Sequence, residues 1–83
     1  LIMENRVAVI SIIVTNPASV EKLNGILHDY ADYVIGRMGI PYKNKSMNII
    51  CIAVDAPQDE ISALSGKLGR LDGVTAKTAI AKA

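Results

Sequence analysis

The segment from Val7 to Val14 is the feature that most limits how this chain can fold. Its apolar, mostly β-branched side chains occupy both sets of alternating positions, so a strand formed here has no face suited to water. One set is Val7, Val9, Ser11 and Ile13, and the other is Ala8, Ile10, Ile12 and Val14. Both faces of this strand therefore need cover, from the chain itself or from a partner.

The length of the chain decides how much cover one molecule can supply. Its 83 residues predict a single domain over 1–83, with an ordered core over about 6–80. Area scaling predicts that folding buries roughly 63% of the unfolded surface, which is marginal for an isolated domain. Because 51% of the residues are hydrophobic, disorder is excluded, and without Phe or Trp the core must use Ile, Val, Leu and Ala.

The first half of the chain predicts a strand, a helix and a second strand. Asn16 is a suitable N-cap for a helix over 17–29, and Pro17 at its first position loses no hydrogen bond. A second strand is expected over about 33–38. The Gly, Pro and Asn residues within 39–45 then predict a hairpin loop, which joins antiparallel strands.

The second half predicts the same order again. A third strand over 47–54 is followed by Asp55 and Gln58, which fit a capping box at the start of a second helix. That helix is expected to bury Ile61, Leu64 and Leu68. A turn at 71–73 precedes the last strand, over about 74–80, in which alternate residues from Val74 to Ile80 share one face.

The two halves also echo each other in sequence. The helical positions Val20, Leu23 and Leu27 recur 41 residues later, and Gly25 matches Gly66, which suggests close helix packing. Two β-α-β units predict a ferredoxin-like βαββαβ α+β fold, ACT-like in form, with a four-stranded antiparallel sheet and two helices on one face.

This architecture leaves one apolar sheet face without cover inside a monomer. Soluble monomers rarely expose a large apolar patch, so we expect a homodimer or tetramer that closes through its sheet faces. The alternative is a monomer that tolerates a few surface valines.

Charge and cysteine content exclude several other partners. A net charge of +1, with basic residues scattered, predicts no direct binding to nucleic acid. The longest apolar run is far shorter than a membrane span, and a single cysteine fits the reducing cytoplasm. We take Met3 as the natural start and leave residues 1–3 out of the fold argument.

Several blocks of sequence resemble known families. The junction Leu71-Asp72-Gly73-Val74 is similar to that of ACT and ACT-like regulatory domains, including the C-terminal domain of the nickel-responsive repressor. More specifically, Ile35-Gly36-Arg37-Met38-Gly39-Ile40-Pro41-Tyr42, together with segments 20–24, 55–57 and 61–71, resembles a small family of iron-only hydrogenase system regulators. The resemblance covers 6–77 and implies an ACT-like oligomer tied to maturation or expression of that hydrogenase.

The sequence gives little support for a metal site or for a catalytic site. His28 and Cys51 are the only soft ligands and belong to different elements, whereas a zinc or iron–sulfur site needs three or four ligands. A metal-binding module would need His28 and Cys51 from several chains. No nucleophile–base set and no phosphate loop is present, so we expect no enzyme, no catalytic residue, no metal and no cofactor.

With catalysis and metal binding set aside, the function class that remains is binding of a small effector or a protein partner. Candidate residues are Asn16, Arg37, Gly39 and Tyr42. In ACT domains the loop after the first strand binds effectors, but 15–18 lacks their glycine, and Asn16 could serve only as a cap. The Arg37–Tyr42 block combines a cation, a turn and a hydroxyl, although its glycine and proline could equally serve the turn alone. We predict a non-enzymatic regulatory module that acts as a homo-oligomer and binds a small effector at its subunit interfaces. The first alternative is a structural adaptor for a maturation or transcription partner, and the second is the metal-binding module.

Overall fold

The computed structural model describes residues 4–82, so the expected start at Met3 lies outside the described residues. The elements are β1 (Asn5–Val14), α1 (Val20–Asp29), β2 (Val34–Tyr42), β3 (Met47–Pro57), α2 (Gln58–Gly69) and β4 (Val74–Ile80). Short 3-10 turns occupy η1 (Pro17–Ser19), η2 (Ala31–Tyr33) and η3 (Lys43–Lys45). The strands form one antiparallel sheet in the order β2-β3-β1-β4, which confirms the predicted ferredoxin-like topology.

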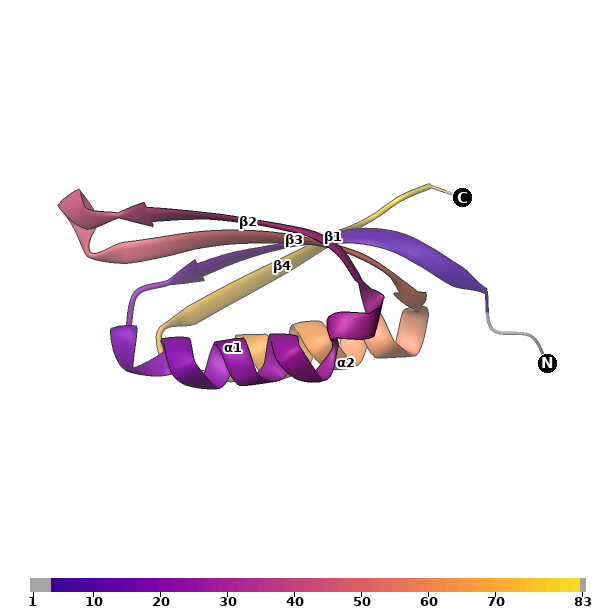
Figure 1. The fold of residues 1–83 in the computed structure, drawn as a ribbon, viewed down its shortest axis with the longest axis horizontal. Coiled ribbons are helices and arrows are strands. Elements are labelled where there is room, and N and C mark those ends of the chain that lie inside the picture. Colours follow the sequence, from indigo (N-terminus) through magenta and orange to yellow (C-terminus); the bar gives the residue numbers. More distant parts are fainter. Residues whose placement is uncertain (1–3, 83) are drawn as a thin grey trace.

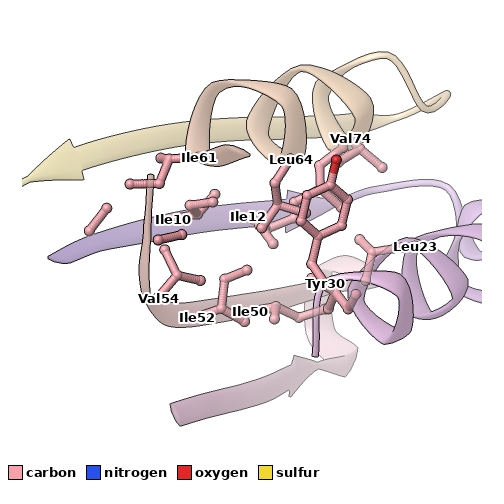
Figure 2. Close-up of a cluster of buried hydrophobic side chains, with 14 of the residues drawn as sticks. Ile10, Ile12, Leu23, Tyr30, Ile50, Ile52, Val54, Ile61, Leu64 and Val74 are labelled. Carbon is pink, nitrogen blue, oxygen red and sulfur yellow. The ribbon is translucent and has the colours of Figure 1, made fainter. Parts of the chain in front are cut away.

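Both helices lie on the same side of the sheet (Figure 1). The core forms between them and the sheet, where even-numbered residues of β1 and β3 meet Leu23, Ile61 and Leu64 from the helices and Tyr30 just after α1 (Figure 2). On β1 the even-numbered set is buried, whereas Val7, Val9 and Ile13 keep 37–45% of their surface exposed. One apolar face of β1 is therefore buried beneath the helices and the other is exposed, as the sequence predicts. No helix within residues 4–82 has the length and apolar character needed to cross a bilayer.

The β2–β3 hairpin is longer than the sequence predicts. Strand β2 continues to Tyr42, so the expected loop over 39–45 is wrong for its first four residues. The connection is confined to Lys43–Lys45 and Ser46, which adopts a left-handed conformation at φ 51°. Pro41 is compatible with this arrangement because β2 is an edge strand, where a missing N–H donor can face solvent.

The two helix starts differ from each other. The Ala18 N–H donates to Asn16 Oδ1 at 3.0 Å, so Asn16 caps the 3-10 turn η1, whereas α1 itself begins at Val20, three residues later than the sequence predicts. The capping box at Asp55 is wrong: Asp55 lies in β3 opposite Val7, and α2 begins only at Gln58, after Pro57. The pairing of β3 with β1 continues to Pro57, and this longer ladder keeps Asp55 extended.

The helical glycines do not serve close packing. A Cβ at Gly25 would meet no atom within 4 Å, and one at Gly66 would meet only the flexible Arg70 side chain at 3.6 Å. The packing role expected from the sequence echo is therefore wrong within one chain.

We expect Gly25→Ala to stabilise the protein. Alanine lowers the backbone entropy of the unfolded chain and fits the open space, so the gain should be about 0.5–1 kcal/mol. Thermal unfolding followed by circular dichroism should show a midpoint a few degrees higher. A lower midpoint would mean that Gly25 faces another molecule at close range.

Candidate functional site

Asn16 is occupied by contacts within the fold. Its Oδ1 accepts from Ala18, and its Nδ2 donates to the Asp72 carboxylate. Neighbouring residues hold the same junction: Thr15 N–H donates to Gly73 O at 2.7 Å, and Ser19 Oγ donates to Asp72 O at 2.6 Å. These bonds fasten the β1–α1 loop to the α2–β4 turn, so both ends of the Asn16 amide already have partners.

Arg37 and Tyr42 lie on opposite faces of the sheet. Arg37 pairs with Ile52, whose side chain is buried on the helix side, and Tyr42 pairs with Met47 on the other side. No turn separates them, because β2 runs through the whole block. The structure therefore divides the predicted block: Arg37 and Gly39 share the helix side, whereas Tyr42 does not join them.

Arg37 stands at the boundary between β2 and α1. Its Nη2 donates to Asn24 Oδ1 on α1 at 3.0 Å. On one side of Arg37 a hollow of about 380 Å³ opens, which we call the α1/β2 groove. It is lined by Asn24, Leu27, His28, Ala31, Val34, Arg37 and Ile52. A smaller hollow of about 260 Å³ lies beside Gly39, Val20 and Ile50.

Sequence reasoning missed Asn24 and the position of His28. Asn24 and His28 are four residues apart, a spacing that places both on one side of a helix. This spacing is visible in the sequence, but which strand faces this side of α1 depends on how the helix packs against the sheet. The exposed His28 therefore lines the groove beside Arg37.

The opposite side of the sheet carries what we call the open sheet face. Its side chains come from all four strands, in rows set by the strand register: Val7, Val9, Ser11, Ile13, Met38, Ile40, Tyr42, Met47, Ile49, Cys51, Ala53, Asp55, Thr75, Lys77 and Ala79. Of the nine large hydrophobic residues exposed within residues 4–82, all but Ile35 and Ile80 lie on it. The face is most apolar over β2, β3 and β1, and more polar along β4, where Thr75 and Lys77 lie.

His28 and Cys51 do not meet within one chain. Cys51 is half-buried on the open sheet face, whereas His28 lines the groove on the helix side. Among residues 4–82 no three His, Cys, Asp or Glu side chains cluster closely enough to hold a metal ion.

The sheet order and the one-sided helices define a ferredoxin-like, ACT-like α+β domain. A formyltetrahydrofolate deformylase from Pseudomonas putida KT2440 shares this fold, with a TM-score of 0.63 and 10% identity over 87% of this chain and 28% of that chain. The uncharacterized protein TM1266 from Thermotoga maritima is 34% identical, with a TM-score of 0.92 over 95% of this chain and 100% of that chain.

The family model described as "Iron-only hydrogenase system regulator, putative" matches residues 6–78. The chain therefore belongs to the TM1266-like family, which confirms the resemblance found in its sequence. Comparison with curated proteins gave no significant match.

Proposed function

We propose that this protein is a non-enzymatic regulatory module of the iron-only hydrogenase system that acts as a homo-oligomer. The observation that carries the proposal is the open sheet face, whose seven large hydrophobic side chains lie exposed in one chain. Contiguous apolar patches of this kind mark interaction sites in soluble proteins. A second copy of the chain supplies a matching apolar surface through a two-fold axis.

The dimensions of the face suit a stable dimer. Four strands spaced about 4.8 Å apart give a width of about 19 Å, and strands of seven to eleven residues are roughly 23–36 Å long. The flat area is then on the order of 600 Å², and side-chain relief adds to it. A specific interface buries about 800 Å² on each partner, so one face is close to sufficient.

Regulation would follow if a ligand or partner favours one assembly over another. Under this proposal a small effector binds near Arg37. The second candidate is an adaptor that carries no ligand and docks a hydrogenase maturation or transcription partner. Native mass spectrometry of protein purified from its own cells separates them: a retained small molecule supports the effector, and bare polypeptide in every charge state favours the adaptor.

The regulatory role itself is tested by deleting the gene in its host. We expect hydrogenase activity or hydrogenase transcript to change severalfold, and wild-type protein supplied in trans to restore it. An interface variant, Ile13→Lys, should fail to restore it, whereas Ile80→Lys on the other side of the sheet should succeed. Unchanged transcript and unchanged activity in the deletion strain would contradict the proposal.

A further inference from the structure

The polar side of the α1/β2 groove holds a cation without a charged partner. The Arg37 guanidinium donates to the neutral Asn24 Oδ1, and the described residues supply it with no other hydrogen-bond acceptor. A guanidinium has five N–H donors in a planar fork that matches a carboxylate in a bidentate pair. Arg37 is exposed and lines the groove, so an anion can reach the N–H donors that Asn24 leaves free.

Apart from the exposed His28, the remainder of the groove is apolar. Leu27 and Ile52 are buried core residues that also line the hollow, and Ala31 and Val34 complete this side. A volume of about 380 Å³ falls near the lower end of the range for small-molecule sites. The groove therefore offers the Arg37 fork and the His28 ring next to an apolar wall.

We propose that the α1/β2 groove binds a small monocarboxylic acid with a short apolar tail. The carboxylate pairs with Arg37, whose hydrogen bond to Asn24 orients it, and the tail lies against Leu27 and Val34. One fork suits a singly charged carboxylate better than a phosphate, which usually requires several cations or a row of backbone N–H donors. This inference rests on the proposed function, because the acid would be the effector of the regulatory module.

The test uses hexanoate as the probe and 1-hexanol as its uncharged counterpart, in titrations of ¹⁵N-labelled full-length protein followed by NMR. Hexanoate should shift the amide signals of 24–37 in a saturable way, and hexanol should bind at least tenfold more weakly. Arg37→Gln should weaken hexanoate binding at least tenfold, and Arg37→Lys should be intermediate because it keeps the charge and loses the fork. Arg6→Gln is the matched control, since Arg6 lies in a different hollow and bonds to Ala81 O.

The inference is overturned by equal binding of hexanoate and hexanol, by unchanged affinity in folded Arg37→Gln, or by shifts confined to the open sheet face. Tighter binding of inorganic phosphate than of hexanoate would also overturn it, since an anion site without a role for the tail would then remain. Sedimentation of the same samples keeps the two proposals separate. A dimer that does not bind hexanoate would contradict only this inference. A monomer that binds hexanoate would contradict only the proposal that the chain forms a homo-oligomer.

Discussion

Gly73→Ala is expected to destabilise the protein by about 3 kcal/mol or more, because left-handed strain and a steric clash act together. Gly73 adopts φ +68°, and an added Cβ would lie 2.6 Å from Asn16 Cβ and 2.8 Å from Asn16 N. The segments after β1 and before β4 cannot move apart freely, because Thr15 N–H and Thr15 Oγ1 both donate to Gly73 O, at 2.7 and 3.1 Å.

Urea unfolding at one fixed protein concentration measures this loss, since association would make stability depend on concentration. Gly69→Ala is the matched control: it makes the same chemical change at the end of α2, where a Cβ would meet no atom within 4 Å. We expect the control to stay within about 1 kcal/mol of the wild type. Equal midpoints for Gly73→Ala and the wild type would show that the β1–α1 loop is not fixed against this turn.

Ile13→Lys is expected to weaken self-association by at least about 100-fold, because a symmetric interface would bury the new charge twice. Ile13 lies on a central strand of the open sheet face, directly opposite Ile49 of β3. Its exposure of 41% in one chain leaves room for lysine in the monomer, so folding should survive.

Ile80→Lys serves as the control, with a similar exposure of 36% but a place among Ser65 and Thr78 on the helix side. It should associate like the wild type. The thiol of Cys51 gives a second readout, because it shares the open sheet face with Ile13 and should react faster with a thiol reagent in the dissociated variant. Unchanged association of folded Ile13→Lys would place the interface elsewhere, for example along a sheet edge.

The alternation of residues in β1 predicts most of the architecture. Because every second residue from Ala8 to Val14 is buried beneath the helices, the first set remains uncovered, as the one-sided arrangement requires. The buried side of helix α2 could also be predicted from the sequence, because Ile61, Leu64 and Leu68 follow helical spacing, and all three are buried.

Features that depend on strand pairing could not be predicted from the local sequence in the same way. Gly39 and Pro41 look like loop residues locally, but pairing with β3 keeps them extended. Asp55 likewise looks like a helix cap until the ladder with β1 holds it in β3. The groove was hidden for the same reason: Arg37 and Asn24 meet only when β2 and α1 are placed by the whole sheet.

Sedimentation equilibrium of the wild-type protein at micromolar concentration tests the central claim most directly. The claim is that the open sheet face is closed by another copy of this chain. A mass of two or four times the 8.9 kDa of one chain is the predicted result. A single species of 8.9 kDa throughout that range would contradict it.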